Sequence, residues 1–273
     1  MKYKTIKTNN PLKTEIIFFF KDHIKHAFST AVDVLHQEGV IGLIKKFFRY
    51  YLFSLFLMPW LVLEAKKIGR NSSLKTIVNF GMADNFGLLR SGQINSEIHA
   101  LLSIVKALKP QVIVEIGTAT GGTLFMLSRV LEPKGILISI DLPYGKFGGG
   151  YHVWKIPLYK SFATEKQKIY LLRVDSHKLM TLKKLKQLLD KQLIDFLFID
   201  GDHSAKGVMK DFKMYSGLVR KGGLIAFHDI VSCSKSSDCK VDLFWNKIKR
   251  THQYQEIIND KNQDWGGIGI LKC

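Results

Sequence analysis

The segment VIVEIGTATGGT, residues 112–123, decides the fold of this chain. Its first half predicts an apolar strand that carries Glu115 near its end, and its second half predicts a glycine-bearing turn that opens a helix at about Gly121. Glycine in such a turn lets the backbone approach a ligand closely. A dinucleotide-binding turn would read G-x-G-x-x-G, but Ala119 stands where the second glycine is needed. The segment therefore predicts a ligand-binding strand–turn–helix unit and argues against NAD or FAD.

On both sides of this segment, from Gln93 onward, short apolar runs alternate with helical stretches, which is typical of a parallel sheet with crossover helices. We expect strands at 112–116, 136–140, 169–174, 196–199 and 224–227, near 255–259 and near 268–271. We expect helices at 121–131, 178–191, 204–219 and about 241–252. This order predicts an α/β fold with a Rossmann-like, doubly wound, seven-stranded sheet, mostly parallel with an antiparallel last strand. We assign it to residues 91–273, after an N-terminal helical extension over 1–90.

Acidic residues follow the strands beside the glycine-bearing turn. Asp141 ends the second strand, 24 residues after Gly117, where a carboxylate can accept hydrogen bonds from both hydroxyls of a ribose. Asp175 and Ser176 follow the third strand and can face an adenine amino group. Taken singly, either aspartate is also typical of a helix cap or a loop. Three acids in series at strand ends favour a cofactor site.

The pattern E-x-G-x-x-x-G, formed by Glu115, Gly117 and Gly121, resembles motif I of class I S-adenosylmethionine-dependent methyltransferases. In that family the loop passes under the methionine part of the cofactor. The resemblance implies that this chain binds S-adenosylmethionine. We expect Thr118, in the same loop, and Asp200, at the end of the fourth strand, to belong to the same cofactor site.

A second group of polar residues ends the fourth and fifth strands, in FLFIDGDHS and LIAFHDI. Carboxylates and imidazoles gathered there can coordinate a divalent cation, with Asp200, His228 and Asp229 as ligands. Such a cation would bind a substrate hydroxyl and lower its pKa. The alternative is that these side chains only shape the pocket. We expect His203 to be the general base, since a neutral imidazole of pKa ~6.5 accepts a proton at physiological pH; a surface histidine is the alternative.

Residues 97–271 resemble the family that includes cephalosporin hydroxylase-like proteins and macrocin-type sugar O-methyltransferases. The segments that carry the resemblance are VEIGTATGGTL, ISIDLPYGKFGGGY, LLRVDSH and FLFIDGDHSAKGVMKDFKMYSGLVRKGGLIAFHDI. It implies methylation of a hydroxyl on a glycan or small molecule, with a phenolic acceptor as the second choice. The catechol and caffeoyl-CoA O-methyltransferases are more distant relatives by pattern.

Their metal-binding acid falls on Asp200, their Asp-Asn pair on His228 and Asp229, and their catalytic lysine on His203. His228 departs from that pattern, because a carboxylate is expected there. A histidine ligates Mn, Fe or Zn but suits Mg poorly, and this departure puts metal dependence in question; the candidate ions are Mg, Mn and Fe. Two other functions stay open: an accessory protein that binds S-adenosylmethionine without transferring its methyl group, and a membrane-bound scaffold that has lost the cofactor.

The segment PYGKFGGGYHVW, residues 143–154, is too long and too rich in glycine for a simple connection. It predicts a mobile lid over the substrate, in which Tyr144, Phe147, Tyr151 and Trp154 cover a sugar or aromatic ring. A disordered surface loop is the alternative.

The N-terminal stretch 41–63 predicts a basic amphipathic helix that continues into an apolar one. Its uncharged run from Tyr50 to Leu63 is shorter than the ~20 residues that a bilayer requires, and Pro59 interrupts it. A helix that lies in the membrane interface and a helical cap that packs on protein, including a second copy in a homo-oligomer, both fit this pattern.

The formal net charge of +18 indicates an anionic partner, and the charge alone does not choose among a membrane surface, a nucleic acid and a phosphorylated substrate. Because the charge is spread along the chain and forms no discrete nucleic-acid-binding arm, we expect no nucleic acid as partner. The three cysteines form no CxxC pair, and charges at Lys21 and Asp22 interrupt the first apolar stretch. These features predict a cytoplasmic protein, free in solution or bound at the inner face of the membrane.

Overall fold

The computed structural model describes residues 39–42, 44, 57–147, 150–232 and 238–273. By packing, the chain divides into two compact units, Met1–Leu57 and Met58–Cys273. Most of the predicted amphipathic stretch 41–63 lies outside the described residues. None of the helices that the structure describes is long and apolar enough to cross a bilayer.

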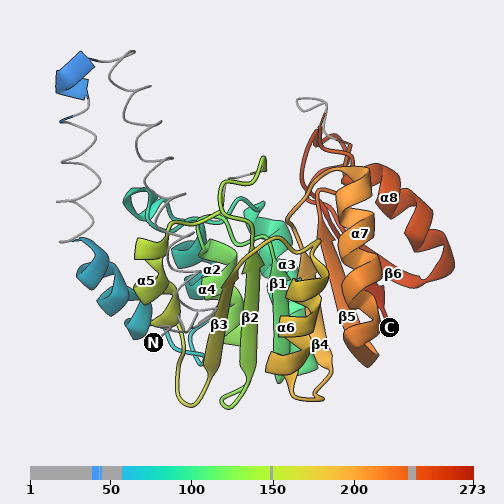
Figure 1. The fold of residues 1–273 in the computed structure, drawn as a ribbon, viewed down its shortest axis with the longest axis horizontal. Coiled ribbons are helices and arrows are strands. Elements are labelled where there is room, and N and C mark those ends of the chain that lie inside the picture. The colour runs from blue at the N-terminus through green and yellow to red at the C-terminus, as the bar shows by residue number, and fades with distance from the viewer. Residues whose placement is uncertain (1–38, 43, 45–56, 148–149, 233–237) are drawn as a thin grey trace, which may run out of the picture. The chain divides into compact units, whose positions relative to one another are not determined.

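The second unit contains a seven-stranded sheet whose strand order is β3-β2-β1-β4-β5-β7-β6 (Figure 1). The strands are β1 (Val112–Ile116), β2 (Ile136–Asp141), β3 (Lys168–Arg173), β4 (Ile194–Ile199), β5 (Val219–His228), β6 (Gln253–Ile257) and β7 (Ile268–Lys272). Strands β1 to β5 pair in parallel, and β7 pairs antiparallel with both β5 and β6. The predicted doubly wound sheet with an antiparallel last strand is confirmed. Its order reverses at β1, next to β4, where open α/β sheets bind their ligands.

Helices cover both faces of the sheet. The helices are α2 (Leu74–Met82), α3 (Asn95–Leu108), α4 (Gly122–Val130), α5 (Ile156–Lys160), α6 (Leu179–Leu189), α7 (Ala205–Tyr215) and α8 (Val241–Ile248). Figure 1 shows α6 and α7 in front of the sheet, whereas α2, α3 and α4 pack on one another. Short 3-10 turns lie at Asn85–Gly87, Val153–Lys155, Ser216–Leu218 and Lys249–Thr251.

Strand β1 shows how the sequence builds this sandwich. Val112, Val114 and Ile116 join the apolar core that α6, α7 and α8 complete. Side chains alternate along a strand, so Ile113 and Glu115 point to the other face. All five residues are buried, as expected of a central parallel strand with helices on both sides.

The segment before the sheet belongs to the same compact unit. Arg129 of α4 is 1% exposed, and its guanidinium donates hydrogen bonds to the carbonyl oxygens of Ala65 (2.9 Å) and Ile68 (2.5 Å). These carbonyls end a helical stretch at 57–67, so the buried guanidinium caps it. Residues 58–90 therefore pack with the sheet, and the division by packing lies at 57/58. The functional boundary that we place at 90/91 stays a prediction.

Candidate active site

A cavity of about 690 Å³ lies at the carboxyl ends of the parallel strands. Residues that follow β1, β2, β3, β4 and β5 all contribute to its lining. The predicted site residues that line it are Gly117, Thr118, Asp141, Asp175, Ser176, Asp200, His203, His228 and Asp229. The topology therefore brings these nine residues, which the sequence spreads over more than a hundred positions, into one cavity.

The turn after β1 forms the floor of the cavity. Gly117 has φ +91°, and a Cβ there would overlap the main-chain carbonyl of Asp200. Only glycine fits this close approach between the turn and the end of β4. Ala119 has φ +44°, so the residue that replaces the second glycine of a dinucleotide-binding turn still adopts a left-handed conformation.

Glu115 and Gly121, which we expected to contact the cofactor, do not line this cavity. Glu115 is fully buried and accepts a hydrogen bond of 2.7 Å from the hydroxyl of Thr118. Burial raises its pKa well above the ordinary range, the hydrogen bond from Thr118 lowers it, and the charge of Asp141 raises it further. Gly121 caps α4 with φ +85°, and a Cβ there would lie 2.5 Å from the ring of Tyr159. Both residues therefore stabilise the conformation of the turn and do not reach the cavity.

Asp141 lines the cavity, and one of its carboxylate oxygens is buried without a donor among the described residues. The residue is 8% exposed, and its Oδ2 atom is buried without a hydrogen-bond partner among the described residues. Burial raises the pKa of this carboxyl to about 6, even though the backbone N–H groups of Thr118, Tyr151 and Ala119 lower it. A buried acceptor without a donor is costly, so a ligand hydroxyl at Oδ2 would remove a real penalty.

Asp175 and Ser176 line the cavity at the end of β3. Part of the Asp175 side chain serves a local turn, since its Oδ1 accepts a hydrogen bond of 2.8 Å from the backbone N–H of His177. Its Oδ2 lies 3.6 Å from the ammonium of Lys178. The helix-cap alternative is thus present for Asp175, while the residue still borders the cavity.

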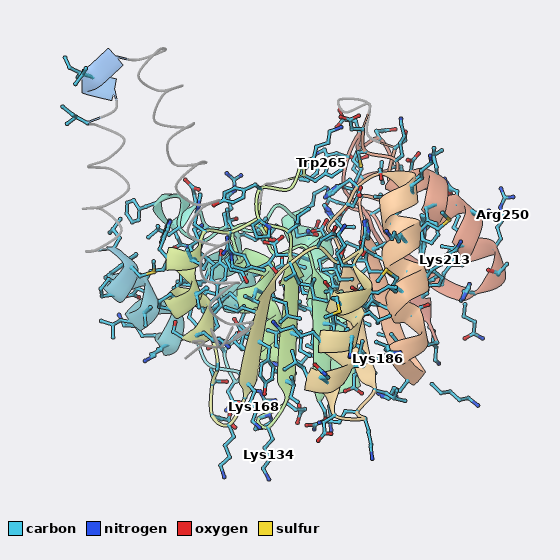
Figure 2. All side chains as sticks on the ribbon, in the orientation of Figure 1. Lys134, Lys168, Lys186, Lys213, Arg250 and Trp265 are labelled. Carbon is cyan, nitrogen blue, oxygen red and sulfur yellow. The ribbon has the colours of Figure 1, made fainter. Side chains whose placement is uncertain are left out.

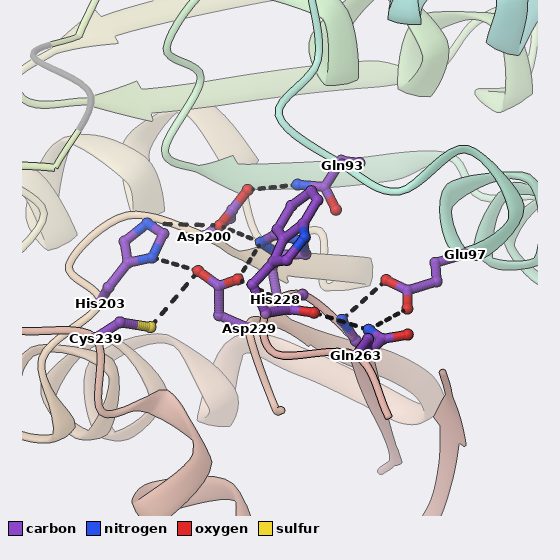
Figure 3. Close-up of polar contacts among 11 residues, drawn as sticks. Gln93, Glu97, Asp200, His203, His228, Asp229, Cys239 and Gln263 are labelled. Carbon is purple, nitrogen blue, oxygen red and sulfur yellow. Dashed lines mark hydrogen bonds and ion pairs between the residues drawn. The ribbon is translucent and has the colours of Figure 1, made fainter. Parts of the chain in front are cut away.

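The reaction end of the cavity is a hydrogen-bonded cluster (Figure 3). The Nδ1 atom of His203 lies 2.6 Å from Oδ2 of Asp229, and the thiol of Cys239 is 3.7 Å from the same oxygen. Asp229 has φ +61°, an uncommon conformation for a residue with a side chain. This backbone turns the carboxylate back toward His203 at the point where β5 ends.

Asp200 and His228 complete the cluster. The Nδ1 atom of His228 lies 3.2 Å from Oδ1 of Asp200 and 3.3 Å from Oδ1 of Asp229. The side-chain amide of Gln93 donates a hydrogen bond of 2.8 Å to Oδ2 of Asp200. The Nε2 atom of His228 is buried without a hydrogen-bond partner in the described part of the chain.

The carboxylates set the charge of both imidazoles. Burial lowers the pKa of His203, but the hydrogen bond to Asp229 and the charge of Asp200 raise it far more. Burial likewise lowers the pKa of His228, and the same two carboxylates raise it well above the ordinary histidine value. The expectation of an unperturbed pKa near 6.5 for His203 is therefore wrong for this charge environment. The carboxylates of Asp200 and Asp229 therefore favour the protonated form of both imidazoles.

Two groups of side chains have the donor chemistry of a metal site. Asp200, His228 and Asp229 bring one ligand atom each to within 4.8 Å of one another, as do His203, Asp229 and Cys239. Two carboxylates with one imidazole suit Mn or Fe. The first group is the one that we predicted from the sequence.

The predicted lid residues have different surroundings. The ring of Phe147 stacks on that of His203 at 5.1 Å between centroids, so it does cover the reaction end. Tyr151 is only 3% exposed and packs against Tyr159, which makes it part of the core and not of a cover. Trp154 stacks on His152. Gly148 and Gly149 lie outside the described residues.

Three residues at this site carry no motif that identifies them in the sequence. Arg90 is exposed and lines the cavity beside the turn after β1. Trp265 lines it next to His228, and Gln93 contacts Asp200. Each reaches the site through a long-range contact, which the local pattern does not reveal.

Known proteins share this fold and this domain. Residues 114–230 match the family model described as "Methyltransferase domain". The O-methyltransferase from Bacillus cereus in complex with SAH is 18% identical and matches with a TM-score of 0.50 over 73% of this chain and 90% of its own. Cofactor-bound Rv0187 from MTB is 16% identical, with a TM-score of 0.52 over 73% of this chain and 87% of its own.

A candidate caffeoyl-CoA O-methyltransferase from Staphylococcus aureus is 15% identical, with a TM-score of 0.52 over 79% of this chain and 99% of its own. At such identities these likenesses establish the fold. An uncharacterised protein of Acanthamoeba polyphaga mimivirus is 56% identical over 36 residues, which are 13% of this chain. The match spans only 16% of that curated relative.

Proposed function

We propose that this protein is an S-adenosylmethionine-dependent methyltransferase that methylates a hydroxyl oxygen of a glycan or small molecule; the match of residues 114–230 to a methyltransferase domain supports this. One observation carries the proposal: Asp141, whose buried Oδ2 has no partner among the described residues, lines the same cavity as the His203–Asp229 pair. The first is what a cofactor ribose requires, and the second is what a hydroxyl acceptor requires.

The residues present fit S-adenosylmethionine. Oδ2 of Asp141 would accept a hydrogen bond from the ribose, and the turn at Gly117, which packs closely on the main chain of Asp200, would lie beside the methionine part. Ser176 and Asp175 border the adenine. Arg90 supplies a cation for the methionine carboxylate, since its side chain makes no ion pair within the described ranges. When bound, S-adenosylmethionine supplies a methyl group on a positively charged sulfur.

The chain's own contribution to methyl transfer is positioning and the removal of one proton. Asp229 engages Nδ1 of His203, which fixes the ring and leaves Nε2 facing Asp200 at 3.7 Å. We assign proton acceptance from the substrate hydroxyl to this Nε2 atom. Because the carboxylates favour the protonated ring, His203 must first lose a proton. Positive charge bound in the same cavity favours that loss.

A divalent cation would be held by Asp200, His228 and Asp229. It would orient the substrate hydroxyl and lower its pKa. The support is the convergence of three ligand atoms within 4.8 Å of one another, together with the buried Nε2 of His228, which has no partner among the described residues.

The test is methyl transfer by the purified full chain. Labelled S-adenosylmethionine is incubated with a panel of sugars, glycosylated compounds and phenols, and products are identified by the mass of one added methyl group. A methylated hydroxyl supports the proposal. Binding of the cofactor with no transfer to any acceptor would point instead to the accessory role.

A further inference from the structure

The loop between β6 and β7 reaches into the reaction end of the cavity from a distant part of the sequence. The backbone N–H of Gly266 donates a hydrogen bond of 3.2 Å to Oδ1 of Asp229. The carbonyl oxygens of Gly266 and Gly267 accept from the backbone N–H groups of Val231 (3.0 Å) and Ile230 (3.3 Å). The loop is therefore joined directly to the segment that carries the acid of the His203 pair.

Glu97 of α3 anchors this loop from the other side (Figure 3). Its side chain is fully buried and accepts hydrogen bonds from the backbone N–H groups of Gly267 (2.9 Å) and Asn259 (3.0 Å) and from the amide of Gln263 (2.8 Å). No lysine or arginine within the described ranges pairs with it. All the hydrogen bonds that its side chain accepts within the described part of the chain come from this loop, so the buried carboxyl group depends on the loop for its partners.

The two glycines fix the path of the chain between these anchors. Gly266 and Gly267 both have φ +77°, which disfavours any side chain. A Cβ on Gly267 would lie 2.8 Å from Val231 and 2.9 Å from Ile230. The turn therefore has little freedom, and the residue before it, Trp265, is held where the turn puts it.

Trp265 lies at the edge of the molecule where the strands end. Figure 2 labels it at the upper edge, opposite Lys134 and Lys168, which lie at the start of β2 and β3. Its side chain lines the cavity, is 39% exposed, and meets the ring of His228 edge-on at 6.5 Å. Phe147 covers His203 in the same cavity. Each histidine of the cluster thus has an aromatic neighbour in the cavity, and Trp265 is the one that is partly exposed.

A large aromatic face beside hydrogen-bonding groups binds a ring that has one apolar face and polar groups at its edge. We infer that Trp265 is the platform on which the ring of the methyl acceptor stacks, and that Glu97 is the positioning residue that holds it there. The acceptor is accordingly a hydroxyl-bearing ring, a pyranose or a phenol. This inference rests on the proposed function and names the acceptor class for the same site.

The first experiment tests the platform with the full chain saturated with S-adenosylhomocysteine and labelled with 5-fluorotryptophan. Fluorine NMR resolves the four tryptophans, and Trp265→Phe identifies the resonance of interest. Titration with methyl α-D-glucopyranoside and with 4-nitrocatechol distinguishes the two ring classes. We expect one probe to shift the Trp265 resonance and Trp265→Leu to weaken its binding about tenfold.

The matched control for this variant is Trp60→Leu, because Trp60 is similarly exposed, at 43%, and does not line the cavity. Affinity for S-adenosylhomocysteine should be the same in all three proteins. If neither probe shifts the Trp265 resonance, or if Trp265→Leu binds both probes as the parent does, the platform is refuted. If S-adenosylhomocysteine itself does not bind, the proposed function fails, which is a different result.

The second experiment tests the role of Glu97. Glu97→Gln should move the Trp265 resonance and weaken the same probe, with unchanged affinity for S-adenosylhomocysteine. The control is Glu256→Gln, because Glu256 accepts a hydrogen bond of 2.6 Å from the indole of Trp245 and should move that resonance instead. A Glu97→Gln protein that is folded, with the Trp265 resonance in its original place, would overturn the positioning role.

Discussion

Replacing Asp141 by Asn should raise the stability of the ligand-free protein and weaken its binding of the cofactor. The wild-type residue is 8% exposed and keeps one oxygen without a donor in the part of the chain that the structure describes. Its pKa is raised from 3.8 to about 6, chiefly by burial. A folded-state pKa above the unfolded value means that the folded protein binds the proton more tightly. The stability that this group contributes is therefore complete below pH 3.8 and is lost as the pH rises through 6.

The difference of about 2 pKa units corresponds to about 3 kcal/mol at neutral pH. Asp141→Asn removes the buried charge, so the ligand-free variant should be more stable than wild type at pH 7.5 by up to that amount. For a protein of this size the melting temperature should rise by about 2–10 °C. At pH 4 the two melting temperatures should converge.

Affinity should change in the opposite direction. An amide gives the ribose hydroxyls a weaker acceptor, and loss of charge-assisted hydrogen bonds costs about 1.5–3 kcal/mol, or about 10- to 150-fold in Kd. Wild-type affinity for S-adenosylhomocysteine should also fall as the pH drops below 6, because the protonated carboxyl accepts poorly. The variant should lack this pH dependence.

Differential scanning calorimetry and isothermal titration of both proteins measure these effects. The control is Asp195→Asn, since Asp195 is also 8% exposed but accepts hydrogen bonds from the backbone N–H groups of Gln111 and Val112. That variant should lose stability and keep its affinity for S-adenosylhomocysteine. An Asp141→Asn protein that is less stable than wild type at pH 7.5, or that binds S-adenosylhomocysteine as tightly, would refute the reasoning.

The other predictions concern catalysis, the metal and the N-terminal stretch. His203→Ala should lower turnover by about 10²- to 10⁴-fold with little change in cofactor affinity, and full activity would remove the base assignment. If a cation orients the substrate hydroxyl, chelation and Asp200→Ala should each abolish methyl transfer. Added Mn should restore activity to the chelated wild type but not to the variant, and full activity in excess EDTA would exclude the cation. The stretch 41–63 should bind the full chain to anionic vesicles at low salt, and exchange of Lys45, Lys46 and Arg49 for Glu should release it; equal flotation of both proteins would assign the stretch another role.

Much of the sheet follows from local patterns in the sequence. Apolar runs that end in or near an acid predicted the five parallel strands β1 to β5, because a buried parallel strand needs such a run and its carboxyl end needs polar residues. Strand β5 begins at Val219, earlier than the expected 224, because Gly222 and Gly223 form an irregular part of the strand and not a turn before it. Helices α3 and α5 were not predicted; α5 begins at Ile156, directly after the segment 143–154 that we read as a lid, and it carries Pro157 in its first turn.

Some residues of the candidate site were likewise predictable from the sequence, and others were not. Asp141, Asp200 and His228 were predictable because parallel strands end at one edge, so position along a strand fixes position in space. Glu97 and Trp265 were not, because the contact of Glu97 with Gly267 joins residues 170 positions apart. The shifted pKa of His203 was also hidden, since it depends on the exact approach of Asp229 across two strands.

The most direct test of the central claim is calorimetric titration of the full chain with S-adenosylhomocysteine and, separately, with NAD. The claim is that the cavity beside Asp141 accepts an S-adenosyl cofactor and that the turn with Ala119 does not hold a pyrophosphate. We expect micromolar-range binding of S-adenosylhomocysteine and no measurable heat with NAD. Binding of NAD without binding of S-adenosylhomocysteine would contradict the account.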